Sequence, residues 1–226
     1  PYRRQRQMCI RDRLYFTAFT CAMGGVTVNG LPYIDFLVPG LVAMASMTQA
    51  WAIAVDINIA RFYWHMLDEF MTCPLSASGY VAGETAAGIV RATGASVIIM
   101  IIGTLAGVHV NLLAPGLWLA LVLNAWFFSG LAIMMAMLVK SHADQALLSN
   151  FVITPMAFLG GTFFPLERLP EWARHLLGVL PLPHAAGAMQ AAAAGRPVAW
   201  SELGILAIGA FAVFLGAVHS VSRARS

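Results

Sequence analysis

Residues 112–139 read LLAPGLWLALVLNAWFFSGLAIMMAMLV and contain no charged side chain. The hydrocarbon core of a bilayer is about 30 Å thick, and a helix of roughly 20 apolar residues crosses it, so this stretch predicts a membrane span. Four further long runs are apolar, at residues 36–55, 86–108, 146–164 and 203–221. A sixth apolar run, at residues 14–26, is too short to cross. The sequence therefore predicts an all-α polytopic membrane protein with six transmembrane helices, the first of them truncated.

The composition leaves no room for a separate soluble enzyme. Of the 226 residues, 60% are hydrophobic and 10% are charged, and the mean hydropathy is +0.77. Soluble globular domains have about 25% charged residues. Once the spans are subtracted, too few residues remain for a soluble catalytic domain, so any function must reside in the spans and their loops.

The net charge of +3 comes from the beginning of the chain, PYRRQRQMCIRDR. This stretch lacks an initiator methionine and resembles translated adapter sequence. We therefore interpret residues 1–13 as a non-native leader and residues 14–226 as the transmembrane domain. The alternative is a genuine basic flank on the cytoplasmic side of the first span.

Basic residues in the short loops predict the topology, because Lys and Arg favour the cytoplasmic side. One side of the predicted spans is flanked by Arg61, Arg91, Lys140, Arg223 and Arg225. The other side is flanked by Arg168, Arg174 and Arg196. This bias places both termini in the cytoplasm, with the 61–85 loop also cytoplasmic and the 165–200 loop outside.

Two of the loops have the pattern of amphipathic helices. In residues 61–72 the apolar side chains form one stripe, and Pro74 ends the helix because it has no N–H to donate. We expect this helix to lie along the cytoplasmic membrane face. In the outer loop, Pro170 suits a helix start, and a second stripe runs to Leu180, where Pro181 ends it. An Ala-rich segment follows, so we expect a short external helical pair.

A few polar residues lie within or beside the spans. Arg91 is the one charge inside an apolar run, five residues from the start at residue 86. Intramembrane charges are functional hypotheses by default. The alternative is that the Arg91 side chain snorkels, since it lies about 7–8 Å from the start of the run. The candidate substrate pathway comprises Asp35, Asp56, Arg91, Asn124 and Asn150. Hydrogen bonding between helices is the alternative role for each amide.

Several kinds of chemistry are not indicated. Lys140 is the only lysine, and no GxxxxGK precedes it, so the chain has no P-loop to hold ATP phosphates. Its three cysteines form no CxxC pair, and its six histidines form no HExxH pair, which excludes the usual metal patterns. Asp68 and Glu69 are adjacent, so they point about 100° apart and do not make a paired-carboxylate site. The sequence predicts no catalytic residue and no metal ligand.

Three stretches together resemble the membrane subunit of type-2 ABC exporters, the family of nodulation-factor and daunorubicin-resistance permeases. They read YIDFLVPGL at 33–41, HMLDEFMTCPLSASGYVAGE at 65–84 and FVITPMAFLGGTFFPLERLPEWARHLLGVLPLPHA at 151–185. In the last stretch the family's external-helix pattern is carried by Pro165, Leu169, Pro170 and Trp172. The chain departs from the family where members read Asn-Pro-Leu-x-Tyr, since it has Leu180-Pro181-Leu182-Pro183-His184.

The resemblance implies a permease of the bacterial cytoplasmic (inner) membrane that pairs with a second permease copy and with two separate ATP-binding subunits. ATP and Mg would bind to those subunits and not to this chain. The permease would also contact membrane lipid, and no nucleic-acid partner is implied. The helix that docks on the ATPase maps to residues 61–74, with its motif at Arg61, Asp68, Glu69, Phe70 and Pro74.

The sequence thus predicts the permease of an ATP-driven exporter for a drug, a lipid, or a lipo-oligosaccharide or polysaccharide. Two alternatives stay open. A membrane-embedded lipid-modifying enzyme would cluster His, Asp or Glu at one membrane face, whereas this chain scatters them. A non-transporting scaffold would share the composition but would not associate with an ATPase.

Overall fold

The computed structural model describes residues 27–28, 31–64, 76–108, 110–139, 141–163 and 170–225. These residues are almost entirely helical, apart from one short antiparallel pair, β1 (Thr27–Val28) with β2 (Leu31–Pro32). The longer helices are α2 (Tyr33–Trp51), α3 (Ile53–Phe62), α5 (Ala77–Leu105), α6 (Pro115–Leu138), α10 (Pro181–Ala193) and α11 (Trp200–Arg225). The shorter ones are α7 (His142–Leu148), a π-helix (Ser149–Ile153), α8 (Thr154–Leu159) and α9 (Glu171–Leu177).

Four helical stretches are long and apolar enough to cross a membrane, judged by length and composition. They are Tyr33–Phe62, which joins α2 and α3, and then Ala77–Leu105, Pro115–Leu138 and Trp200–Ala224. Each overlaps one of the predicted runs, so the all-helical membrane architecture is confirmed with four candidate spans. The run predicted at 146–164 overlaps the consecutive segments α7, the π-helix and α8. Residues 14–26 lie outside the described residues.

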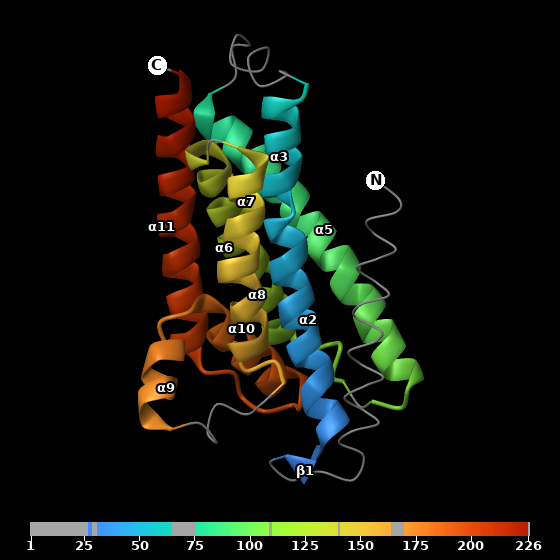
Figure 1. The fold of residues 1–226 in the computed structure, drawn as a ribbon. Helices are drawn as coiled ribbons and strands as arrows, with labels where there is room; N and C mark the ends of the chain where they lie inside the picture. Colours follow the sequence, from blue (N-terminus) through green and yellow to red (C-terminus); the bar gives the residue numbers. More distant parts are fainter. Residues whose placement is uncertain are drawn as a thin grey trace.

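The helices alternate in direction along one bundle (Figure 1). The end of α3, the starts of α5 and α7 and the C-terminus lie at one end, which we call the inner end after the predicted topology. The starts of α2, α6 and α11 lie at the opposite, outer end, together with α9 and α10. The end of α3, the start of α5 and the C-terminus therefore share one end of the bundle, as the distribution of basic residues predicts.

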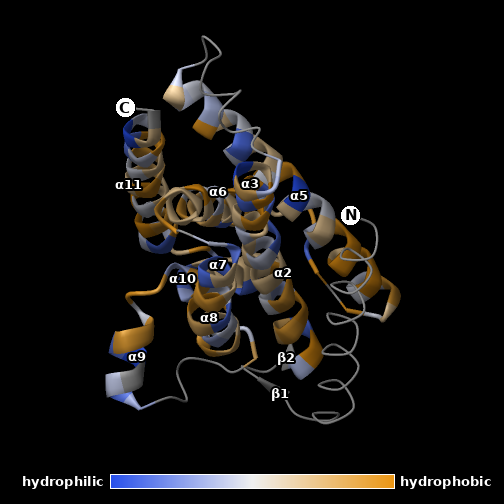
Figure 2. Cartoon of the chain, turned by 45° about the horizontal axis from the view of Figure 1, so that its top comes forward, coloured by the Kyte–Doolittle hydropathy of each residue, from blue (hydrophilic) through white to orange (hydrophobic). Residues whose placement is uncertain are grey.

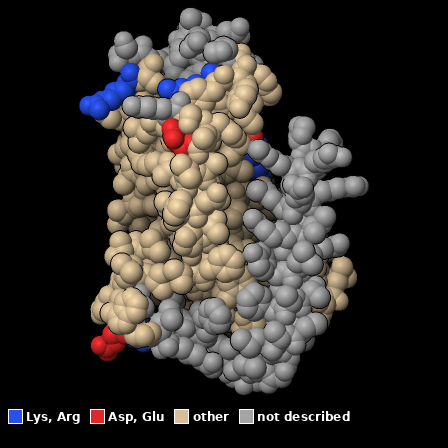
Figure 3. Space-filling view, viewed as in Figure 1, with Lys and Arg blue, Asp and Glu red and all other residues tan. Residues whose placement is uncertain are grey.

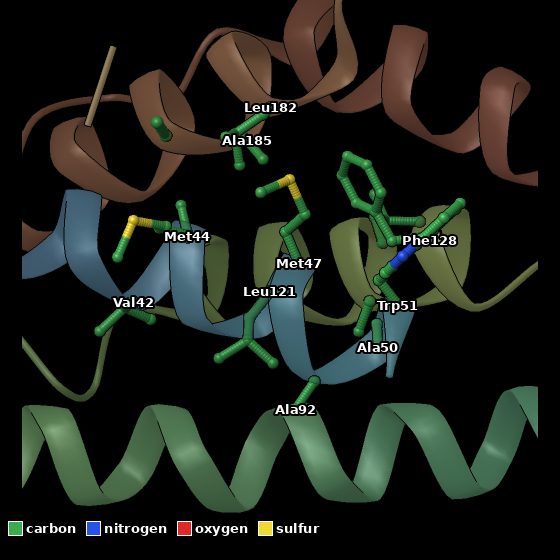
Figure 4. Close-up of a cluster of buried hydrophobic side chains, with 14 of the residues drawn as sticks. Val42, Met44, Met47, Ala50, Trp51, Ala92, Leu121, Phe128, Leu182 and Ala185 are labelled. Atoms are coloured by element: carbon green, nitrogen blue, oxygen red, sulfur yellow. The ribbon is translucent and has the colours of Figure 1, made fainter. Parts of the chain in front are cut away.

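Helix α6 is central, because it packs against α2, α3, α5, α10 and α11. Its first residue is Pro115. Proline has no N–H to donate, but an N–H at the first helical position has no intrahelical acceptor in any helix, so no hydrogen bond is lost. The core beside it contains Met47 and Trp51 of α2, Leu121 and Phe128 of α6, and Leu182 of α10 (Figure 4). The interior of the bundle is thus an apolar cluster to which several helices contribute.

The charged side chains of the visible face lie toward the two ends of the bundle. On the visible face, Lys, Arg, Asp and Glu occur near the inner end and at the outer edge, with a broad uncharged belt between them (Figure 3). Hydrophobic residues dominate α2 and much of α5 and α11 (Figure 2). An uncharged belt flanked by charged ends is the surface that a bilayer requires.

The two helices predicted in the 165–200 loop are present as α9 and α10, but their boundaries differ from the prediction. Helix α9 ends at Leu177, before the predicted end at Pro181. Pro181 instead begins α10, since proline is favoured in the first helical turn. Helix α10 is not a surface helix, because Leu182, Ala185 and Met189 are buried against α2, α6 and α11.

Candidate functional site

Helix α3 carries polar side chains toward its neighbours at the inner end of the bundle. Trp51, at the end of α2, and Asn58 and Arg61 of α3 are spaced seven and three residues apart, which places them on one helix face. This face meets α6 and α7. We call the contacts that these three side chains make the inner tethers.

The first inner tether joins α3 to the end of α6. The Nη1 atom of Arg61 donates to the backbone oxygens of Ala136, Met137 and Val139 at 3.0, 3.2 and 3.3 Å. Helix α6 ends at Leu138, so these are carbonyls of its last turn, which have no partner within the helix. The guanidinium also lies over the Phe62 ring, 5.0 Å from its centroid.

The other two inner tethers join this face to α7 and the π-helix. Asn58 Nδ2 donates to Gln145 Oε1 at 3.2 Å, and both side chains are fully buried. Trp51 Nε1 donates to Ser149 Oγ at 2.8 Å, and that hydroxyl donates to the Gln145 backbone oxygen at 2.9 Å. Ser149 is the first residue of the π-helix, and π-helical turns frequently occur at functional sites.

The Asp56 side chain makes an ion pair with α5. Arg91 Nη1 lies 2.7 Å from Asp56 Oδ2, with 36% of the Arg91 side chain and 51% of the Asp56 side chain exposed. Helix α5 begins at Ala77, nine residues before the predicted run, because Ser76 caps it by accepting from the Gly79 N–H at 3.1 Å. Arg91 is therefore about 21 Å along the axis from the helix start, and it has a carboxylate partner.

The five residues of the predicted substrate pathway are not gathered at one place. Asp56 and Arg91 are in contact. Asn124 is buried and donates to α2, with Nδ2 at 2.7 Å from Ser46 Oγ and 3.2 Å from the Ala43 oxygen. Asp35 lies in the first turn of α2 at the outer end, and Asn150 is exposed on the π-helix.

The other predicted site residues are only partly described. Arg61 lies in the last turn of α3, while Asp68, Glu69, Phe70 and Pro74 lie outside the described residues. Of the external-helix motif, Pro165 and Leu169 also lie outside them. Pro170 immediately precedes α9, and Trp172 of α9 is exposed.

Sequence reasoning did not single out Gln145, which is the α7 partner of Asn58. The two residues are 87 positions apart, and no local pattern connects them. A helix start at Ser141 was detectable, because Ser is a good N-cap residue, and its Oγ accepts from the Asp144 N–H. A helix continued from that start would have placed Gln145 and Ser149 on one face, four residues apart.

A family model described as ABC-2 type transporter matches residues 2–193. The chain is 28% identical over 174 residues to the inner membrane transport permease YadH of Escherichia coli K12, which covers 75% of this chain and 67% of that protein. It is 30% identical over 190 residues to nodulation protein J of Sinorhizobium fredii, which covers 82% of this chain and 71% of that protein. Nodulation protein J of Rhizobium meliloti is 29% identical over 191 residues.

Proposed function

The chain belongs to the ABC-2 type transporter family as a membrane permease subunit, and on that premise we propose that it exports a hydrophobic or amphipathic substrate across the bacterial inner membrane. A drug, a lipid, and a lipo-oligosaccharide or polysaccharide are the classes proposed. Two ATP-binding subunits would hydrolyse Mg-ATP, and a second permease, identical or paralogous, would complete the assembly. The C-terminus would be cytoplasmic.

The proposed architecture has six spans. The four candidate spans account for four of them. A fifth would consist of α7, the π-helix and α8, whose residues 142–159 are consecutive in helical segments. The apolar run at 14–26 would belong to the first. In this scheme successive spans alternate in direction, which agrees with the alternation of the described helices in Figure 1.

The proposed mechanism is alternating access, driven from the inner end. Closure of the ATP-binding subunits would displace the amphipathic segment 61–74, in which Asp68, Glu69, Phe70 and Pro74 form the contact. The described flanks of this segment, α3 and α5, both reach the inner end, which supports the assignment. The displacement would change the opening of a cavity between two permease copies.

One observation carries the proposal. The family match extends over residues 2–193 of a chain that has four candidate membrane spans and no P-loop in its sequence, which supports the proposal that a separate ATP-binding subunit hydrolyses ATP. The test is to co-express the chain with the neighbouring reading frames and purify it in detergent. We expect a P-loop protein to copurify stoichiometrically, with vanadate-sensitive ATP turnover. A permease that purifies alone, without nucleotide-dependent activity, would favour one of the two alternative functions, a non-transporting scaffold or a membrane-embedded lipid-modifying enzyme.

The contact residues are tested by Glu69→Lys. Reversing this charge should break the contact with the ATP-binding subunit, so transport should be lost while insertion in the membrane is retained. The matched control is Glu171→Lys, because Glu171 is an exposed glutamate of α9 at the outer end. Normal export by the Glu69→Lys variant would disprove the docking assignment.

A further inference from the structure

Arg61 occupies a position between the proposed ATPase-contact segment and the centre of the bundle. It lies in the last turn of α3, whose final residue is Phe62. Its backbone therefore belongs to the beginning of the 61–74 segment. Its half-buried side chain extends in the other direction, onto the backbone oxygens of Ala136, Met137 and Val139 at the end of α6.

The chemistry of this contact favours a firm connection. The last carbonyls of a helix have no intrahelical donors, and they carry the negative end of the helix dipole. A guanidinium is always charged, donates only, and satisfies several acceptors at once. Within a membrane protein these carbonyls have few other donors to choose from, so loss of the arginine would leave them without a partner.

Helix α6 is suited to pass on a displacement. It packs against α2, α5, α10 and α11, so a movement of its inner end reaches most of the described bundle. In contrast, the other inner tethers of this face, from Asn58 and Trp51, lead to α7 and the π-helix. Among the described side chains of α3, Arg61 makes the hydrogen bonds that lead to the centre of the bundle.

We propose that Arg61 is a positioning residue of the transport cycle, whose guanidinium links the end of α3 to the C-terminal end of α6 and makes the two move together. This inference rests on the proposed function. It assigns to Arg61 a contact inside the permease and not with the ATPase. Any displacement of the end of α3 would then pass through Arg61 to α6.

The test measures distances between spin labels in the complex of the permease with its copurified ATP-binding subunits, with and without Mg-ATP and vanadate. Cys9, Cys21 and Cys73 are first replaced by serine. One label pair, Ala60→Cys with Leu138→Cys, spans the link between α3 and α6. The other pair, Leu138→Cys with Val179→Cys, reports movement of the inner end of α6 relative to the outer end. Leu138 and Val179 are both exposed.

In the unsubstituted protein we expect vanadate trapping to shift the second distance and to leave the first unchanged, because α3 and α6 move as one. In Arg61→Met, which keeps a long unbranched side chain but removes the donors, the first distance should shift and the second should not, while ATP turnover continues. The control Arg196→Met removes an exposed arginine of the outer end and should behave as the unsubstituted protein.

Arg61→Lys distinguishes transmission from folding. Its ammonium keeps the charge and three donors on a shorter side chain, so we expect a second-distance shift of reduced amplitude. If Arg61→Met does not assemble with the ATP-binding subunits, Arg61→Lys is the deciding variant, and a second-distance shift of full amplitude in it overturns the proposal. An Arg61→Met complex with the unsubstituted pattern of both distances also overturns it and leaves the proposed function intact. Absence of the second shift in an unsubstituted complex that turns over ATP also overturns the role of Arg61, whereas failure of a P-loop protein to copurify overturns the proposed function.

Discussion

Helices α2 and α3 form one continuous candidate span, yet their contacts differ in kind. Helix α2 is packed mainly by apolar side chains, with Leu37, Leu41 and Met47 completely or almost completely buried. Its polar contacts include the hydrogen bonds of Ser46 with Asn124 and, at its inner end, of Trp51 with Ser149. Helix α3 is held by polar groups, with Arg61 on α6, Asn58 on α7 and an ion pair to α5. The boundary between them is Ala52, since α2 ends at Trp51 and α3 begins at Ile53.

The two kinds of contact have different consequences for movement. Close-packed apolar side chains interdigitate, so the outer half of the span is expected to move with its neighbours as a unit. Hydrogen bonds between membrane helices contribute only about 0.6 kcal/mol on average, because alternative partners are available. The single hydrogen bonds of Trp51 and Asn58 with the π-helix and α7 can therefore change partners at a small cost. The Arg61 guanidinium, in contrast, holds three carbonyls at the end of α6 at once.

The largest expected effect is at the close approach of α2 to the chain after α8. A Cβ at Gly40 would lie 2.5 Å from the Thr162 backbone oxygen and 3.1 Å from the Thr162 Cα. Because backbone atoms must shift, we expect Gly40→Ala to lower the free energy of unfolding by about 1–3 kcal/mol, measured by thermal unfolding in detergent.

Gly94→Ala on α5 is the matched control, since a Cβ there meets nothing within 4 Å. Removing a helical glycine should stabilise by up to about 1 kcal/mol. Equal melting temperatures for Gly40→Ala and Gly94→Ala would show that the outer half of the span is not tightly packed.

The sequence located the membrane-embedded parts of the helices better than their ends. The predicted run 112–139 differs from α6 by three residues at its start and one at its end. The run beginning at residue 86 misses the start of α5 at Ala77, because Glu84 and small residues precede the apolar part. Apolarity identifies what lies in hydrocarbon, whereas caps such as Ser76 determine where a helix begins.

The candidate site could be predicted only in part, for a similar reason. Asp56 and Arg91 were each singled out because charges are rare in spans, but their pairing depends on how α3 packs on α5. Arg61 was singled out by family resemblance. Its contact with α6 could not be predicted, because the acceptors are backbone oxygens 75 to 78 residues away. Any residue has a backbone oxygen, so the sequence carries no signal for that partner.

A smaller effect is expected at the inner tether between Trp51 and Ser149. Trp51→Phe keeps a large aromatic ring in a buried position and removes the donor of the 2.8 Å hydrogen bond. In a double-mutant cycle with Ser149→Ala, we expect a coupling energy of about 0.6 kcal/mol, measured by thermal unfolding in lipid nanodiscs. A coupling energy above about 2 kcal/mol would contradict the view that the hydrogen bonds with α7 and the π-helix change partners at a small cost.

The smallest expected effect is at the ion pair between Asp56 and Arg91, because both side chains are partly exposed. We expect a coupling energy at the low end of the range for exposed pairs, about 0.2 kcal/mol, between Asp56→Asn and Arg91→Gln, and partial recovery in the charge-swapped Asp56→Arg, Arg91→Asp protein. The cycle of Arg91→Gln with Glu171→Gln is the control and should be additive, since Glu171 lies on α9 at the outer end. If the swap recovers no stability, the surroundings of the two positions favour one arrangement of the charges over the other. The contact of α3 with α5 is then less exchangeable than the hydrogen bonds of Trp51 and Asn58.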